Sequence, residues 1–192
     1  MRRDDRRLYR ACQADLRSLI GSGAAEGLSF RSADDICALL ARQRGMAIHR
    51  YPASLGGHPY GLVVRGKDFC LILYERRTSS WHQQGIILHE CAHILYDHRG
   101  AEDGTAAALR VLVPDLPIER FSTIHRRTGN EEGHRPDDED QAEAFATVGL
   151  AWLSHASRRG HSTDSVTAEA PPPGDPAVAT AVRRLLEDFA GG

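Results

Sequence analysis

The apolar residues in the first quarter of the chain recur at helical spacing. Between residues 4 and 20 they fall mostly three or four positions apart, which predicts an amphipathic helix that ends at the glycines from Gly21 onward. A second helical pattern follows Ser32, a residue type suited to the N-cap, and stops at Gly45. We therefore expect two helices before the first strand.

The next segments have the composition of strands. Residues 46–51 predict a short strand. Residues 60–75 predict an antiparallel hairpin that turns at residues 65–68, because two β-rich runs flank a turn that contains glycine. The second run, residues 69–74, is either a plain core strand or a sheet edge that pairs with an extended peptide.

Helical spacing returns in the second half of the chain. A helix is expected from about Trp81 to about His98, where Ser80 is followed three residues later by a glutamine in the spacing of a capping box. Residues 105–113 and 118–127 predict two shorter helices. Residues 138–157 predict a long helix with a clear apolar stripe.

These elements divide the chain into a central domain with two appendages. We assign residues 1–30 to an N-terminal helix and residues 31–158 to one α+β domain. Residues 159–175 are rich in proline and predict a linker, and residues 176–192 predict a C-terminal helix. A chain of 192 residues is long enough for such a domain to bury a core of its own.

The composition argues against several classes of function. The 24 basic and 26 acidic residues give a net charge of -2, so no global field attracts nucleic acid or an anionic membrane, although the N-terminal arginines could form a small contact surface. No two of the four cysteines have CxxC spacing, and the apolar neighbours of Cys37, Cys70 and Cys91 indicate buried, reduced thiols. No run reaches the roughly 20 apolar residues of a membrane span, and the N-terminus lacks the apolar segment of a secretory signal. We expect a cytoplasmic protein with no membrane and no direct nucleic-acid partner.

Two histidines and a glutamate interrupt the most apolar helix. His89, Glu90 and His93 form the pattern HExxH, in which the two histidines lie one helical turn apart and can reach one metal ion. Glu90 follows the first histidine and can flank a water rather than bind the metal. Two histidines and a carboxylate form a catalytic zinc set that leaves one coordination position open. The alternative is that these are ordinary half-buried histidines.

The carboxylate ligand has to come from another segment. Glu139 and Glu143 share one face of the helix predicted over residues 138–157, and the apolar side of that helix can pack on the HExxH helix. One carboxylate can bind the metal while the other accepts a hydrogen bond from a ligand imidazole. The alternative for both is a solvated acidic helix start that complements the helix dipole.

The two motifs together resemble those of the gluzincin metallopeptidases, and most closely those of the ImmA/IrrE family. The segments "HECAHIL" and "EDQAEAFATVGL" match the two motif helices of that family, and the resemblance covers roughly residues 30–155. It implies a zincin-like minimal domain in which a small antiparallel sheet packs on helices that include the HExxH helix. It also implies Glu139 as the third zinc ligand and Glu143 as the contact of a ligand histidine. Gln141 stands where the family frequently has a glutamate, and "GLAWLS" replaces its usual "LLMP".

The implied chemistry is zinc-assisted hydrolysis of an amide bond. Zn²⁺ lowers the pKa of its water and polarises the scissile carbonyl, and Glu90 is expected to move the proton from that water to the leaving amine. The oxyanion needs a further donor, and the candidates are Tyr96, His125 and His134. His98 is interpreted as a favourable cation at the helix end, with a stray metal contact as the alternative.

The sequence therefore predicts an intracellular zinc metallopeptidase. The resemblance implies a protein or peptide substrate, and substrates in that family are often repressor-like DNA-binding proteins. The alternative is a catalytically silent regulatory or toxin-like interaction module that zinc only stabilises. In that case a fourth protein ligand such as His125 or His134 would close the site.

Overall fold

The computed structural model describes eight helices and strands of the chain. The described residues are 3–25, 27, 30–55, 60–66, 69–98, 123–124 and 136–159. They form the helices α1 (Arg3–Ala24), α2 (Ala33–Arg44), α3 (Ser80–Leu95) and α5 (Pro136–Arg159), and the strands β1 (Ala47–Ala53), β2 (Gly61–Arg65), β3 (Phe69–Glu75) and β4 (Thr123–Ile124). The predicted α+β class is confirmed. Most of the predicted linker and all of the predicted C-terminal helix lie outside the described residues.

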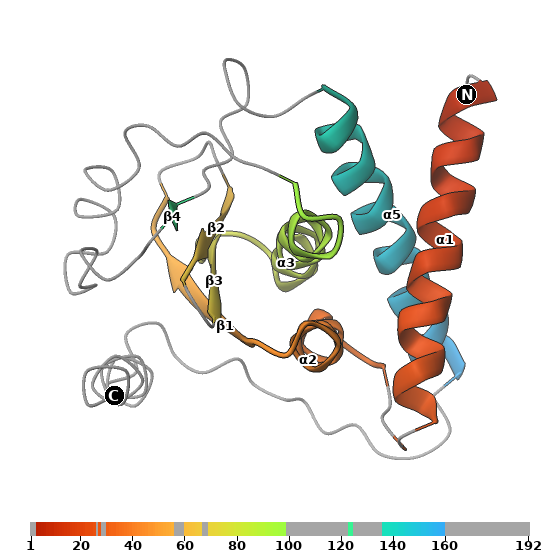
Figure 1. Cartoon of the computed structure of the whole chain (residues 1–192), viewed down its shortest axis with the longest axis horizontal. Helices are drawn as coiled ribbons and strands as arrows, with labels where there is room; N and C mark the ends of the chain where they lie inside the picture. Colours follow the sequence, from red (N-terminus) through yellow and green to blue (C-terminus); the bar gives the residue numbers. More distant parts are fainter. Residues whose placement is uncertain are drawn as a thin grey trace.

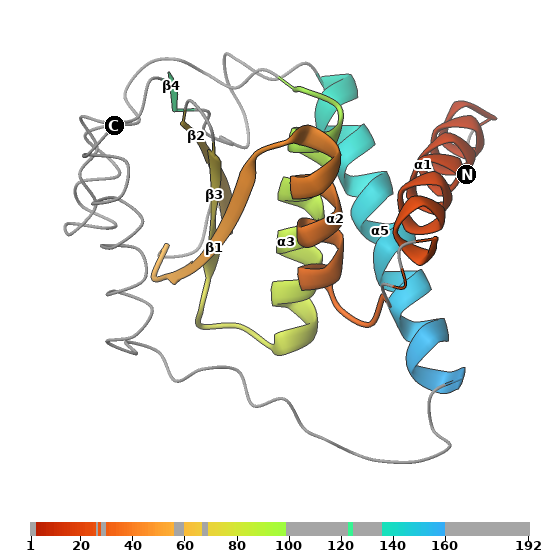
Figure 2. The same ribbon diagram turned by 60° about the horizontal axis from the view of Figure 1, so that its bottom comes forward.

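Helix α3 lies between the sheet and the two longest helices (Figures 1 and 2). The sheet forms one outer layer, α2 and α3 form the middle layer, and α1 and α5 form the other outer layer. Helix α3 contacts β2 and β3 on one side and α5 on the other. This placement explains why the helix is apolar on nearly all sides. None of the described helices has both the length and the apolarity needed to cross a membrane.

The sheet is mixed rather than antiparallel. Its strand order is β1-β3-β2-β4, and β2 and β3 form the predicted hairpin, with Val63 opposite Ile72. Strand β1 pairs parallel to β3, with Ile48 opposite Cys70, so the predicted all-antiparallel sheet is wrong for this pair. Because β2 already occupies one edge of β3 through the hairpin, β1 pairs with the other edge. Strand β3 is therefore central, and the alternative that residues 69–74 form a sheet edge is wrong.

A fourth strand lies where a helix was predicted. Thr123 and Ile124 form β4 and pair antiparallel to β2, with Ile124 opposite Val64. Both residues are β-branched, which favours an extended backbone beside a buried strand. The helix predicted over residues 118–127 is therefore wrong at these positions. The helix predicted over residues 105–113 lies outside the described residues.

Glycines have different roles in the first two helices, as a helix end in α2 and as a close contact in α1. Helix α2 begins after Ser32, whose N–H donates to the Asp35 carboxylate (3.0 Å), and ends at Gly45 with a left-handed φ of 63°, as predicted. Helix α1 does not stop at Gly21 but continues to Ala24. A Cβ on Gly23 would lie 2.3 Å from Leu39 Cδ2, so this glycine lets α1 approach α2 closely.

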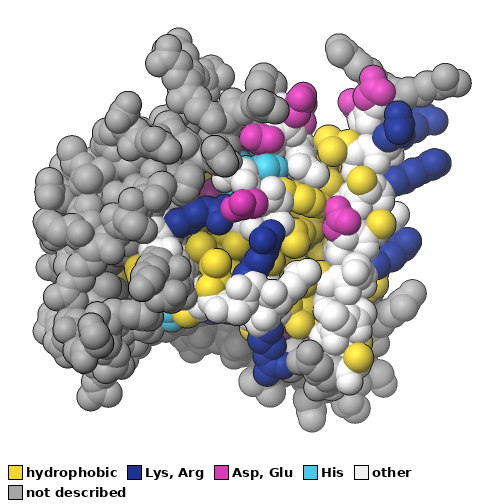
Figure 3. All heavy atoms as spheres, viewed as in Figure 1, with side chains coloured by type: hydrophobic (Ala, Val, Ile, Leu, Met, Phe, Trp, Pro, Cys, Tyr) yellow, Lys and Arg dark blue, Asp and Glu magenta, His cyan; other side chains and the backbone are white. Residues whose placement is uncertain are grey.

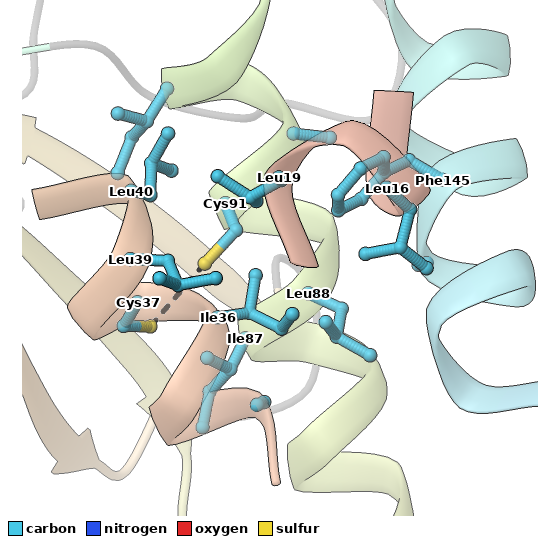
Figure 4. Packing of buried hydrophobic residues seen from close by; sticks show 14 of the residues in the cluster. Leu16, Leu19, Ile36, Cys37, Leu39, Leu40, Ile87, Leu88, Cys91 and Phe145 are labelled. Atoms are coloured by element: carbon cyan, nitrogen blue, oxygen red, sulfur yellow. Dashed lines mark hydrogen bonds between the residues drawn. The ribbon is translucent and has the colours of Figure 1, made fainter. Parts of the chain in front are cut away.

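Apolar side chains from α1, α2, α3 and α5 meet in one core (Figure 4). Leu16 of α1 and Phe145 of α5 are fully buried in it, so the N-terminal helix packs into the same core as the rest. Cys37, Cys70 and Cys91 are buried and free, as predicted, and Cys12 is also buried and free. The thiols of Cys37 and Cys91 lie 3.3 Å apart. The hydrogen bond to Cys37 and burial raise the pKa of Cys91 well above its usual range, which keeps this thiol protonated.

The crossing of α3 and α5 predicts opposite effects for one substitution at two positions. A Cβ on Gly149 would lie 2.9 and 3.1 Å from the two methyl carbons of the fully buried Leu88, whereas nothing lies within 4 Å of a Cβ on Gly21. We expect Gly149→Ala to lower the free energy of unfolding by about 1–3 kcal/mol. Gly21→Ala should raise it by about 0.5–1 kcal/mol. Urea denaturation of both variants measures this, and a stabilised Gly149→Ala variant would contradict the close crossing.

Candidate metal centre

The N-terminus of α3 is fixed one residue earlier than predicted. Ser79 rather than Ser80 is the N-cap, and its hydroxyl accepts a hydrogen bond from the His82 N–H (3.2 Å). The side chain of Gln83 donates to the backbone carbonyl of Arg76 (3.0 Å). These contacts set where the helix begins and hence which residues face α5.

Three predicted ligand residues from two helices come together. The Nε2 atoms of His89 and His93, both buried in α3, lie 2.9 Å apart. Glu139, in the first turn of α5, places one carboxylate oxygen 3.5 Å from His89 Nε2 and the other 3.6 Å from His93 Nε2. The ligand atoms of all three residues lie within 4.8 Å of one another.

This spacing fits a divalent metal ion. Two atoms bound to one tetrahedral Zn²⁺ at its usual bond lengths lie roughly 3.3 Å apart. The separations of 2.9, 3.5 and 3.6 Å among the three residues bracket that value. A cation would also offset the negative charge that Asp137, Asp138 and Glu139 gather in one helix turn. The group can therefore hold a metal, although its geometry alone does not select zinc.

Each ligand imidazole is also contacted on its far nitrogen. The Nδ1 atom of His89 lies 3.6 Å from a carboxylate oxygen of Glu143, which is the contact predicted for this residue. The Nδ1 atom of His93 lies 3.0 Å from Nδ1 of His98, and the other nitrogen of His98 lies 3.0 Å from Oε1 of Gln141. Contacts of this kind orient a ligand ring and fix its tautomer.

The reading of His98 as a cation at the helix end needs correction. His98 is buried and contacts His93 rather than solvent. If α3 continued to residue 98, the two side chains would point about 140° apart around the helix axis, given about 100° per residue. The helix in fact ends at Leu95, and the turn beyond it reverses the chain. No pattern of residue types in the sequence signals this contact.

Glu90 is almost completely buried, and a glycine makes room for its carboxylate. A Cβ on Gly61, the first residue of β2, would lie 2.4 Å from Glu90 Oε1 and 2.7 Å from Ile86 Cγ2. Only a residue without a side chain lets the strand approach the helix this closely. Sequence reasoning missed Gly61, since a glycine at the start of a strand has no distinctive signature.

Of the three candidate oxyanion donors, only Tyr96 lies among the described residues, and its hydroxyl contacts another element. The hydroxyl of Tyr96 donates to the Asp15 carboxylate of α1 (2.9 Å), and its ring meets Phe145 edge-on. Burial raises the pKa of Tyr96, so the phenol stays protonated in this contact. Tyr96 therefore links α1 to the end of α3. His125 and His134 lie outside the described residues.

One member of the ligand group, Glu139, reaches the surface of the molecule. Glu139 keeps 30% of its side chain exposed, while the two imidazoles are buried. On the face drawn in Figure 3, histidine side chains reach the surface beside acidic ones, and basic side chains line the outer edge of α1. Glu139 is therefore the member of the ligand group that solvent contacts most.

Comparisons of the chain with protein-family models, with curated proteins and with solved structures return no match. Any functional assignment therefore depends on the geometry of the site and on the sequence motifs.

Metal binding can be tested by thermal unfolding. At a free Zn²⁺ concentration 100 times Kd, binding adds about 2.7 kcal/mol to the stability. For a domain of this size that corresponds to a rise in Tm of roughly 5–10 °C. Glu139→Ala removes a ligand and should reduce the rise to less than about 2 °C, because a 100-fold weaker site is only half filled. Asp140→Ala, an exposed neighbour, should keep the full rise. Equal rises in both variants would contradict the ligand assignment.

Proposed function

We propose that this protein is a zinc metallopeptidase with a zincin-like domain, acting in the cytoplasm on a peptide bond of a protein substrate. The observation that carries the proposal is the convergence of His89, His93 and Glu139 from two helices within 4.8 Å. This is the ligand set of catalytic zinc in peptidases, two histidines and one glutamate. The resemblance of both motif helices to the ImmA/IrrE family supports it.

The number of ligands favours catalysis over a purely structural role. Structural zinc sites are normally closed by four protein ligands, whereas catalytic sites keep one position for water or substrate. Among the residues that the structure describes, three ligand residues form the group. Glu139, the third of these residues, keeps part of its side chain in contact with solvent.

Different residues of the chain would bind the metal, orient its ligands and transfer the proton. Zinc, when bound, would supply a Lewis acid that acidifies water and polarises the scissile carbonyl. His89, His93 and Glu139 would hold it, and Glu143 would accept a hydrogen bond from His89 Nδ1. Glu90 would accept a proton from the attacking water and return it to the leaving amine. Glu90 is almost completely buried and its carboxylate lies beside Gly61, which restricts where this carboxylate can lie.

The substrate proposed is a protein, with a repressor-like DNA-binding regulator as the example that the family resemblance supplies. The other candidate is a silent module in which zinc only stabilises the fold. The two differ in one measurable property, the hydrolysis of peptides by the zinc-loaded protein.

Hydrolysis can be detected without a known substrate. The zinc-loaded protein is incubated with a library of proteome-derived peptides in H₂¹⁸O, and new peptide ends are identified by mass spectrometry. We expect new C-termini that carry heavy oxygen. Glu90→Gln should keep zinc but cleave about 10²–10⁴-fold more slowly, because it lacks the base.

Two outcomes would count against the peptidase. One is a zinc-loaded wild type that produces no new termini from the library, which favours the silent module. The other is a Glu90→Gln variant that cleaves as fast as wild type, which would exclude the mechanism.

The close approach of β2 to Glu90 gives a second prediction. Gly61→Ala should displace the Glu90 carboxylate and reduce cleavage, while zinc binding by the three ligands remains. A loss of stability of about 1–3 kcal/mol is expected from the added methyl group. Cleavage rate and bound zinc are measured below the Tm of the variant, with Gly21→Ala as the control. Unchanged cleavage would show that the position of Glu90 does not depend on Gly61.

A further inference from the structure

Helix α3 ends in a turn that brings His98 back onto His93. Asp97 has a left-handed backbone with φ of 54°, and the His98 N–H donates to the His93 carbonyl (3.0 Å). The Asp97 N–H approaches the Ile94 carbonyl (3.4 Å), so the two bonds form a Schellman motif. Arg65 of β2 secures the turn, since it donates to the His93 carbonyl (2.8 Å) and pairs with the Asp97 carboxylate (3.2 Å).

The same turn places the His98 imidazole between α3 and α5. One ring nitrogen, Nδ1, lies 3.0 Å from Nδ1 of His93, and the other, Nε2, lies 3.0 Å from Oε1 of Gln141. A carboxylate oxygen of Asp138 lies 3.9 Å from the same Nε2. His98 is only 7% exposed, so protein groups rather than bulk water contact both ring nitrogens.

One arrangement of the ring hydrogens satisfies these contacts. The Gln141 oxygen and the Asp138 carboxylate can only accept, so Nε2 of His98 carries the hydrogen. When the His98 ring carries its one hydrogen on Nε2, its Nδ1 accepts a hydrogen bond from Nδ1–H of His93. The lone pair of His93 is then on Nε2, the atom that faces His89 and Glu139.

We propose that His98 and Gln141 are positioning residues that hold His93 in its metal-binding tautomer. This inference rests on the metal site of the proposed function. Gln141 contacts His98, and neither residue belongs to the three-ligand group. Glu143 has the corresponding place at His89, so the two ligands contact different groups, a carboxylate in one case and an imidazole in the other.

The proposal predicts how Zn²⁺ affinity responds to substitutions at His98. His98→Phe keeps an aromatic ring beside Tyr96 but has no acceptor, so Zn²⁺ should bind about 10- to 100-fold more weakly. His98→Asn places an oxygen near the former Nδ1, so it should restore the affinity to within about threefold of wild type. Competition with a chromophoric chelator measures Zn²⁺ alone and needs no substrate. The absorption bands of the Co²⁺-loaded protein report the ligand geometry independently.

Substitutions at Gln141 test the order of the contacts. Gln141→Glu keeps an acceptor and should bind Zn²⁺ like wild type, whereas Gln141→Leu should weaken binding. If Gln141 acts through His98, Gln141→Leu should cause no further loss in a His98→Phe protein. If the two substitutions instead acted through independent packing effects, their losses of Zn²⁺ affinity would add in the double variant. If His98→Phe does not fold, the comparison of Gln141→Glu with Gln141→Leu still tests the proposal.

The results that would overturn the positioning role differ from those that would reject the peptidase. Equal Zn²⁺ affinities of wild type, His98→Phe and Gln141→Leu, each folded without metal, would overturn the positioning role. So would a His98→Asn variant as weak as His98→Phe. The predicted affinity pattern without any peptide cleavage would leave the positioning role intact and reject the peptidase. A wild type that binds no Zn²⁺ would reject both.

Discussion

The packing of α3 against α5 is the contact on which the candidate site depends. His89 and His93 lie on one helix and Glu139 on the other, so the ligand group exists only while the two helices are docked. Gly149 allows this docking because it leaves space for Leu88 at the crossing. A metal bound by both helices would in turn link them, and its binding free energy would add to that of the apolar contact. Measurements of stability and of metal binding therefore both report on the contact between α3 and α5.

The features that the sequence predicted correctly have a local physical cause. Helical spacing places His89 and His93 one turn apart, and the same spacing places Glu139 and Glu143 on one face of α5. Ser32 and Gly45 bound α2 because capping depends on side chains within a few residues. The contact between the two motif helices was expected from the apolar side of the second one.

The features that could not be predicted depend on distant neighbours. The place of β1 beside β3 follows from which edge of β3 the hairpin leaves available. The extended backbone at residues 123–124 follows from pairing with β2. The contact of His98 with His93 follows from a left-handed residue at Asp97, where glycine would have been the recognisable signal. Gly61 and Gly23 matter only because another element approaches them.

The direction of the Cys91 side chain has a consequence for the choice of metal. Cys91 lies between the two histidines in the sequence, yet its sulfur contacts Cys37 of α2. The group of three ligand residues found in the described part of the chain consequently contains nitrogen and oxygen donors but no sulfur. Thiolate ligands favour soft ions such as Cu(I), whereas imidazole and carboxylate suit harder divalent ions. A cysteine inside the motif is thus compatible with a site that discriminates against soft metals.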